Sequence, residues 1–119
     1  MTPGYRLTAN APLRDRNTFG VQASAPWLIE VDDASALGEV MALPQVAESE
    51  SLVIGGGSTL LFAGDAPGAV IAMATHGLRV LSDDGGQARV RADAGVAWHP
   101  LVMWTLEQGL CGLENLALI

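Results

Sequence analysis

Residues 55–59 read Gly-Gly-Gly-Ser-Thr and form the stretch of this sequence best suited to hold an anion. Glycine is used where a backbone torsion must be left-handed or where another group approaches the main chain closely. A glycine run also leaves successive N–H groups uncovered, and such groups form concave sites for phosphate. The Ser58 and Thr59 hydroxyls add further donors. The run therefore raises the hypothesis of a phosphate-binding loop.

Two familiar phosphate motifs do not fit the run. A Walker loop requires G-x-x-x-x-G-K-[ST], but here Thr59 is followed directly by Leu60 and Leu61, without a lysine. The dinucleotide motif G-x-G-x-x-G fits Gly55 and Gly57, but Leu60 stands where its third glycine belongs. The remaining hypothesis is that the backbone N–H groups of the run bind an anion without help from a lysine. The alternative interpretation is a tight turn, because glycine commonly links two apolar strands.

Few other side chains have the types that catalysis or metal binding needs. His99 lies next to Pro100 and is as consistent with a surface or capping histidine as with a neighbour of a cofactor. Cys111 is the only cysteine, has no histidine or basic residue beside it, and is expected to be a small packed thiol. A single cysteine allows no intrachain disulfide. No metal site and no catalytic residue are predicted.

Composition limits the class of protein. A length of 119 residues suits one domain, and 50% hydrophobic residues exclude the disordered class. The formal net charge is −7, with no basic cluster along the sequence, so nucleic acid and anionic membranes are not expected partners. Residues 1–27 contain no continuous apolar segment. We therefore expect neither a secretory signal nor a membrane anchor, and a cytoplasmic location.

Apolar runs and turn residues predict a mixed α/β order of elements in the first part of the chain. Proline and glycine interrupt residues 1–26, which are expected to be irregular. Apolar spacing predicts a helix over residues 34–43 that ends at Pro44. Asp32 and Asp33 are possible caps of this helix. Strands are expected over residues 27–31, 51–54 and 70–74.

The second part of the sequence predicts a hairpin followed by a helix. Residues 77–95 contain two strand-like runs on either side of Asp-Asp-Gly-Gly, which is typical of a hairpin turn. Residues 95–109 have apolar residues at helical spacing, and Gly109 stands where a C′ glycine belongs. Trp98 lies in this apolar stripe and is therefore expected to be part of the core.

Three stretches of the sequence are distinctive, namely NTFGV (17–21), LVIGGGSTLLF (52–62) and AGVAWHPLVMWTLEQGLCGLENLALI (94–119). They resemble the N-terminal portion of bacterial UDP-N-acetylenolpyruvoylglucosamine reductases. The resemblance, which includes the spacing between the stretches, covers nearly the whole chain from Asn17 onward. It implies an α/β (α+β) fold, namely an FAD-binding domain of the vanillyl-alcohol-oxidase (PCMH) type that is incomplete within these 119 residues.

The resemblance implies a function for the full-length protein. Members of the family are NADPH-dependent flavin oxidoreductases that bind FAD and reduce the enolpyruvyl double bond of a UDP-sugar to give UDP-N-acetylmuramate. The implied ligands are therefore FAD, NADPH and the UDP-sugar substrate. The implied biological roles are peptidoglycan synthesis, cell wall biogenesis, cell shape and cell division in the cytoplasm. The oligomeric state is left open.

The resemblance also assigns residues to the FAD site. The glycine run matches the family's pyrophosphate loop, although Thr59 replaces a more usual asparagine. Asn17 and Thr18 match a segment near the cofactor, but a local Asx or Ser/Thr turn explains them equally well. Glu114 and Asn115 precede a second flavin-binding stretch, where a structural role in the turn is slightly favoured. The predicted cofactor-binding residues are Gly55, Gly56, Gly57, Ser58, Thr59, Leu60, Asn17, Thr18 and Asn115.

The family's catalytic groups have no counterpart in this sequence. In the family, the chain continues past the position of Ile119 with more of the flavin site. A substrate domain then supplies an arginine, a serine or cysteine proton donor and a glutamate. We therefore expect residues 1–119 to be the N-terminal part of an FAD-binding domain and to be inactive alone, because the reaction needs a placed proton donor. The alternative is a non-catalytic nucleotide-binding or interaction module that keeps the fold core.

Overall fold

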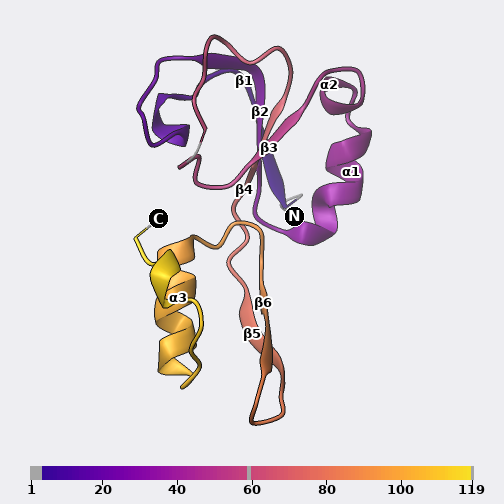
Figure 1. The fold of residues 1–119 in the computed structure, drawn as a ribbon. Coiled ribbons are helices and arrows are strands. Elements are labelled where there is room, and N and C mark those ends of the chain that lie inside the picture. Colours follow the sequence, from indigo (N-terminus) through magenta and orange to yellow (C-terminus); the bar gives the residue numbers. More distant parts are fainter. Residues whose placement is uncertain (1–3, 59, 119) are drawn as a thin grey trace. The chain divides into compact units, whose positions relative to one another are not determined.

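A computed structural model describes residues 4–58 and 60–118, and the chain divides into two compact units, Met1–Thr75 and His76–Ile119. The first unit is built on a four-stranded sheet with the strand order β1-β2-β4-β3 (Figure 1). Strands β2, β4 and β3 run parallel to one another, and β1 runs antiparallel to β2. The strands are β1 (Tyr5–Pro12), β2 (Ser24–Val31), β3 (Leu52–Ile54) and β4 (Val70–Met73).

Strand β1 shows that the expectation of an irregular segment over residues 1–26 is wrong. It pairs with β2 from Tyr5 opposite Val31 to Pro12 opposite Ser24. Most of its side chains are exposed or half-buried, so it has no continuous apolar run to mark it as a strand. Pro12 is tolerated because it ends an edge strand. Pairing with β2 therefore orders β1 more than its own residues do. The strands expected over residues 27–31, 51–54 and 70–74 are confirmed as β2, β3 and β4.

Short helices connect β2 to β3. They are the 3-10 turn η2 (Ala34–Ala36), α1 (Leu37–Ala42) and α2 (Pro44–Ala47). The predicted cap is confirmed, because the Asp33 carboxylate accepts a hydrogen bond from the Ser35 N–H at 2.9 Å. Pro44 follows the end of α1 as expected, and it also begins α2 at a position where proline's fixed φ suits a helix.

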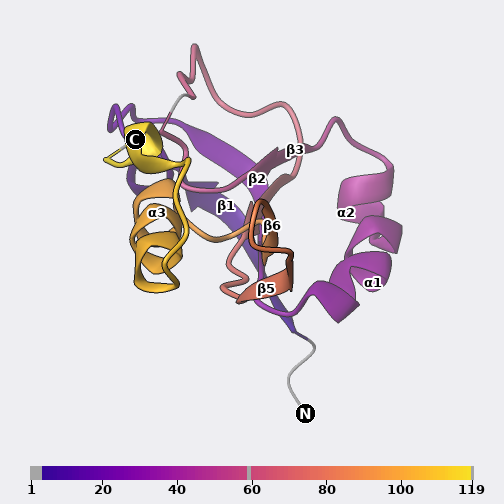
Figure 2. The same ribbon diagram turned by 60° about the horizontal axis from the view of Figure 1, so that its bottom comes forward.

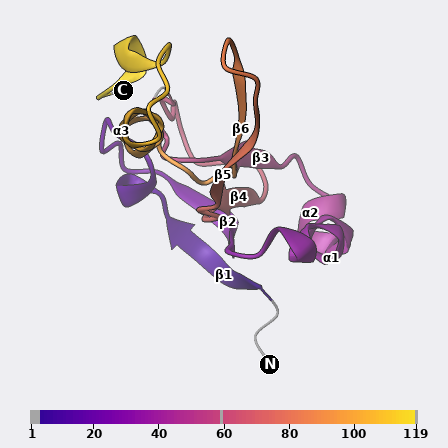
Figure 3. The same ribbon diagram turned by 90° about the horizontal axis from the view of Figure 1, so that it is seen from below.

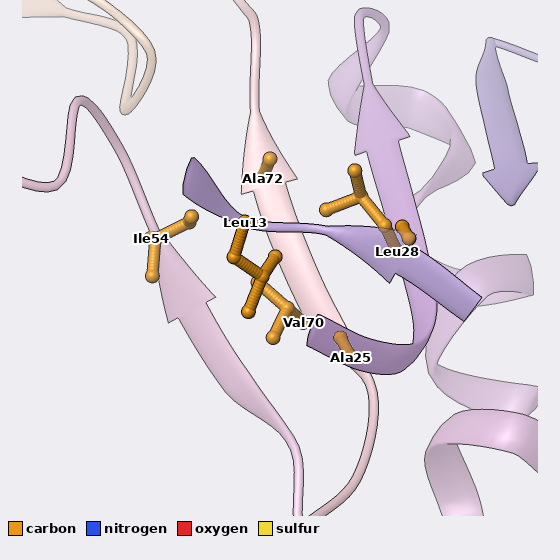
Figure 4. Close-up of a cluster of buried hydrophobic side chains, with 7 residues drawn as sticks. Leu13, Ala25, Leu28, Ile54, Val70 and Ala72 are labelled. Atoms are coloured by element: carbon orange, nitrogen blue, oxygen red, sulfur yellow. The ribbon is translucent and has the colours of Figure 1, made fainter. Parts of the chain in front are cut away.

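The sheet buries apolar side chains on both faces, because successive residues of a strand point to opposite sides. Helices α1 and α2 cover one face, where Val40 and Val46 pack with Ile29 and Ile71 of the central strands (Figure 2). The other face carries the second cluster, drawn in Figure 4. Its buried members are Ala11, Leu13, Ala25, Leu28, Ile54, Val70 and Ala72.

Leu13 is the residue through which a loop covers this second face. It is fully buried and lies over β4 between Ile54 and Leu28 (Figure 4). The Leu13 N–H donates to the Ala23 carbonyl at 2.8 Å, which closes residues 13–23 into a loop. This loop contains the 3-10 turn η1 (Arg14–Arg16). A core residue thus fixes the loop against the sheet.

The second unit contains the predicted hairpin and helix. The hairpin is β5 (Leu78–Asp83) with β6 (Ala88–Ala92), and Figure 3 shows the two strands side by side up to their turn. The helix is α3 (Trp98–Glu107), followed by the 3-10 turn η3 (Glu114–Leu116). Gly109 has φ of 75° just past α3, which confirms the predicted C′ glycine.

Two predictions about side chains of this unit are wrong. Trp98 is 46% exposed and is not a core residue, although Leu101 and Val102 of the same stripe are buried. Helical spacing gives the direction of a side chain, but it does not tell whether another surface lies opposite the first turn. Cys111 is exposed rather than packed, because it lies in the irregular segment between Gly109 and η3.

The hairpin also gathers basic residues that look scattered in the sequence. Arg79 lies directly opposite Arg91, and Arg89 shares a face with Arg91 because it is two residues away along β6. All three side chains are exposed. The expectation of no basic cluster therefore holds along the sequence but not across this pair of strands. Among the helices in the described part of the chain, none is both long and apolar enough to cross a membrane.

We predict that Leu13→Ala destabilises the chain by about 2–5 kcal/mol, the usual cost of truncating a buried leucine. Urea unfolding of the purified chain measures the effect. Met41→Ala is the control, because Met41 is 51% exposed on α1 and its truncation should change stability by no more than about 0.5 kcal/mol. Equal losses in the two variants would contradict the assigned core.

Candidate functional site

The glycine run begins directly after β3, at the carboxyl end of a parallel strand. Open parallel sheets bind ligands outside the carboxyl ends of their strands. Gly55, Gly56 and Ser58 are exposed, and Gly57 is half-buried. Thr59 lies outside the described residues. Figures 1 and 2 trace the chain from β3 into this glycine loop, defined here as residues 55–60.

Gly57 is glycine because the chain's own backbone comes too close for any side chain. A Cβ atom at this position would lie 2.1 Å from the Arg16 carbonyl oxygen and 3.0 Å from the Asn17 Cα. Its φ of 71° is also in the left-handed region, which side chains disfavour. The third glycine of the run is therefore required by the contact between the glycine loop and the loop over residues 13–23.

Gly56 is in a different situation. A Cβ atom there would meet no heavy atom within 4 Å, and its backbone is not in the left-handed region. The space beside Gly56 is therefore open. The second glycine is not explained by packing within the chain, and its bare backbone leaves room for a ligand to approach.

The donors of the glycine loop suit an anionic diphosphate. As far as the structure describes the chain, the amides of Gly56, Gly57 and Ser58 donate to no acceptor within the protein. The exposed Ser58 hydroxyl can add a further donor. In a chain of net charge −7, amide and hydroxyl dipoles rather than lysines would balance the ligand's charge. The residues present therefore fit the phosphates of a dinucleotide.

Asn17 is buried, with 6% exposure, and its side-chain amide organises the 13–23 loop. Nδ2 donates to the carbonyls of Leu13 at 2.8 Å and Val21 at 3.2 Å, and Oδ1 accepts from the Val21 N–H at 3.0 Å. Both amide hydrogens and the oxygen are therefore used within the loop. The local-turn interpretation of Asn17 accounts for all of these bonds.

Thr18 joins the two loops through its main chain. Its N–H donates to the Gly57 carbonyl at 3.2 Å. The Gly20 N–H donates to the Asn17 carbonyl at 3.1 Å, so Thr18 is the second residue of a tight turn. The structure thus brings Asn17 and Thr18 to the glycine loop, although they come from a segment about forty residues earlier. A role for them in a cofactor site stays a prediction.

Leu60 returns the glycine loop to the core. It is half-buried and packs against the cluster that contains Leu13, together with Phe62 and Ala66. The Ala66 N–H then donates to the Ser24 carbonyl at 2.9 Å, which ties the following segment to the start of β2. A contact between Leu60 and a cofactor stays a prediction.

Glu30 of β2 anchors the 13–23 loop electrostatically. Its carboxylate pairs with Arg16 in η1 and with Arg6 in β1, the latter at 2.9 Å. The hydrogen bond from Arg16 is the main cause that lowers the pKa of the Glu30 carboxyl below its ordinary value, with Arg6 contributing less. Arg16 therefore carries both an ion pair to the sheet and the carbonyl that faces Gly57.

Asn115 lies exposed in η3 of the second unit, and its role in a cofactor site stays a prediction. The neighbouring Glu114 carboxylate accepts a hydrogen bond from the Gly112 N–H at 3.0 Å. Its own N–H and that of Gly112 lower the pKa of Glu114. Glu114 thus has the structural role that was favoured for it. His99 Nδ1 accepts a hydrogen bond from the Leu118 N–H at 3.3 Å, which joins the first turn of α3 to the segment after η3.

Two residues that shape the site could not be identified from the sequence. Arg16 acts through its carbonyl oxygen, a group that every residue carries, so its type could not reveal the contact. Leu13 is one apolar residue among many, and only its burial identifies it. Within the described ranges, no three histidine, cysteine or acidic side chains gather to hold a metal ion.

Comparison with known proteins identifies the class to which this sheet and loop belong. The sequence model of the FAD-binding domain family matches residues 25–119. The chain belongs to this family of FAD-binding domains, and its cofactor is FAD. The expected α+β fold and the expected cofactor are thereby confirmed.

Several relatives with similar sequences are enzymes of one kind. The chain is 47% identical over 116 residues to the UDP-N-acetylenolpyruvoylglucosamine reductase of Xanthomonas oryzae pv. oryzae strain PXO99A. It is 49% identical over 115 residues to that of Xanthomonas campestris pv. campestris strain B100. These matches cover 98% and 97% of the chain but only 33% of each relative, so the chain spans about a third of their length.

A solved structure shows the same likeness. The crystal structure of UDP-N-acetylenolpyruvylglucosamine reductase from Thermus caldophilus matches with a TM-score of 0.63 and 25% sequence identity. The match covers 97% of this chain and 38% of that one. The resemblance noted in the sequence is thus confirmed in both sequence and structure.

The two neighbouring glycines should respond differently to alanine. We predict that Gly57→Ala lowers the free energy of unfolding by at least about 1–3 kcal/mol, because the new methyl group meets the Arg16 carbonyl in a left-handed backbone. Gly56→Ala should change stability by less than about 1 kcal/mol. Urea denaturation of both variants checks this, and a stable Gly57→Ala chain would contradict the contact.

The Glu30 ion pairs should give a pH-dependent contribution to stability. Because folding lowers the pKa of Glu30, its contribution is present above the unfolded pKa and is lost as the pH falls through the folded value. Glu30→Gln should therefore shift the urea midpoint downward at pH 7 and have a smaller effect at about pH 3, below the ordinary pKa of a glutamate, with both effects screened by salt. A shift that is the same at both pH values would contradict this origin.

Proposed function

We propose that this chain supplies the diphosphate-binding part of the flavin site in a UDP-N-acetylenolpyruvoylglucosamine reductase. The single observation that carries the proposal is the open backbone at Gly56, beside amides that have no acceptor among the described residues. The proposed donors are Gly55, Gly56, Gly57 and Ser58, with the predicted contribution of Thr59. Leu60 and Asn115 are proposed as further cofactor neighbours.

The whole reaction is proposed for the protein that contains such a domain. Bound FAD would accept hydride from NADPH and deliver it to the enolpyruvyl group of a UDP-sugar. The part played by this chain is to bind and orient the cofactor, while a proton donor and the substrate-binding residues would lie outside residues 1–119. We propose a cytoplasmic role in peptidoglycan synthesis, and through it in cell wall biogenesis, cell shape and cell division. The names of the similar reductases support this assignment.

A second candidate is a non-catalytic nucleotide-binding module. It rests on the same open glycine loop, because binding a nucleotide through backbone amides needs no catalytic group. Such a module would use the same glycine loop to bind the adenine dinucleotide. Measurements of FAD binding and of NADPH oxidation therefore separate the two candidates. Both candidates require FAD binding by the glycine loop, but only the reductase requires that the longer protein oxidise NADPH.

The first experiment is a titration of the purified chain with FAD, followed by quenching of flavin fluorescence. We expect saturable binding that Gly56→Asp abolishes. A carboxylate about 4 Å from a phosphate charge costs about 4 kcal/mol at an effective dielectric constant of 20, which corresponds to about a thousandfold loss of affinity. Circular dichroism should show an unchanged fold, because Gly56 faces open space.

Gly64→Asp is the matched control. Gly64 lies in the same connection between β3 and β4, and a Cβ atom there would also meet nothing within 4 Å. Gly64→Asp adds the same charge to the chain, but at a position outside the glycine loop. Equal losses of affinity in the two variants would place the diphosphate elsewhere, and no binding by a folded wild-type chain would contradict the proposed FAD site.

A further inference from the structure

The glycine loop does not set its own shape. Its third glycine rests on the main chain at Arg16 and Asn17, at a distance that excludes any side chain. The only hydrogen bonds that the described residues make to the Gly57 carbonyl come from the N–H groups of Thr18 at 3.2 Å and Leu60 at 3.5 Å. Of these, the Thr18 bond is the shorter and comes from outside the loop.

The supporting segment is itself rigidly built. The buried Asn17 amide makes three hydrogen bonds within residues 13–21. Leu13 fixes one end of the segment in the core, and the Arg16–Glu30 ion pair fixes the middle to β2. These contacts leave the Asn17 side chain turned into its own loop rather than available for a ligand.

We propose that Asn17 and Thr18 are positioning residues, which hold the glycine loop in the conformation that binds the FAD diphosphate without touching the cofactor themselves. This inference rests on the proposed FAD site. Asn17 keeps residues 13–21 folded, and the Thr18 N–H holds the Gly57 carbonyl so that the neighbouring amides face the open side of the loop. The energetic role of the pair is preorganisation, since a loop that is already ordered loses less entropy on binding.

Thr18→Pro removes the connecting hydrogen bond and also forces the two loops apart, because the proline Cδ replaces the amide hydrogen that faces the Gly57 carbonyl oxygen. Proline has no N–H, and it is favoured at the second position of a tight turn, where Thr18 lies. Asn17 has φ of −140° and ψ of 144°, which is the extended conformation that a residue before proline prefers. The turn and the Asn17 bonds should therefore survive this substitution.

Thr18→Ala is the matched control, because it removes the hydroxyl and keeps the N–H. We expect Thr18→Pro to weaken FAD binding by at least about tenfold, because the Gly57 carbonyl loses its hydrogen bond and is displaced by the proline ring. Circular dichroism should show that the secondary structure of the chain is kept. Thr18→Ala should bind FAD like the wild type. Equal, wild-type affinities in both variants would overturn the inference, and equal losses in both would assign the effect to a hydroxyl contact with the cofactor instead.

A second measurement needs no variant. Amide hydrogen exchange of the wild-type chain should show that FAD slows exchange at Thr18 as well as at Gly56, because binding favours the state in which the two loops are joined. Protection at Gly56 with no change at Thr18 would overturn the inference. Failure of the wild type to bind FAD would instead contradict the proposed function, so the two failures are distinguishable.

Discussion

The contact between Gly57 and the backbone of Arg16 and Asn17 sets the geometry of the rest of the site. It is possible only because Gly57 has no side chain, and it holds only because Leu13 keeps the 13–23 loop pressed on the sheet. The sheet in turn supplies Leu28, Ile54 and Val70 as the floor beneath Leu13. The core cluster thus supports the 13–23 loop, and the 13–23 loop in turn supports the glycine loop.

Charge explains why the ligand loop is built from glycine rather than from basic residues. The chain carries 13 acidic and 6 basic residues, and two of its arginines, Arg6 and Arg16, are paired with Glu30. An anion held here would meet amide dipoles, which bring partial positive charge without a counter-ion. The arginines stabilise the support instead, and the glycines leave the donors uncovered.

Sequence reasoning succeeded where a short pattern decides the local structure. The apolar runs of β2, β3 and β4, the Asp33 cap and the C′ glycine at Gly109 could all be predicted, because each depends on neighbouring residues. It failed for β1, whose order comes from pairing with β2, and for Trp98, whose exposure depends on distant surfaces. The family resemblance brought Asn17 and Thr18 to the site, but only the structure shows the contact that Gly57 makes with them.

The support of Gly57 by a distant segment limits how this motif could be moved or evolve. A designer who transplanted residues 55–60 onto another strand end would carry over the donors but leave behind the surface that shapes them. The smallest portable unit also includes residues 13–23, and with them the parts of β2 and β4 on which Leu13 rests. Because that unit joins residues about forty positions apart, the loop can take its final shape only after the chain has made these long-range contacts, so it should be among the later parts of the molecule to fold.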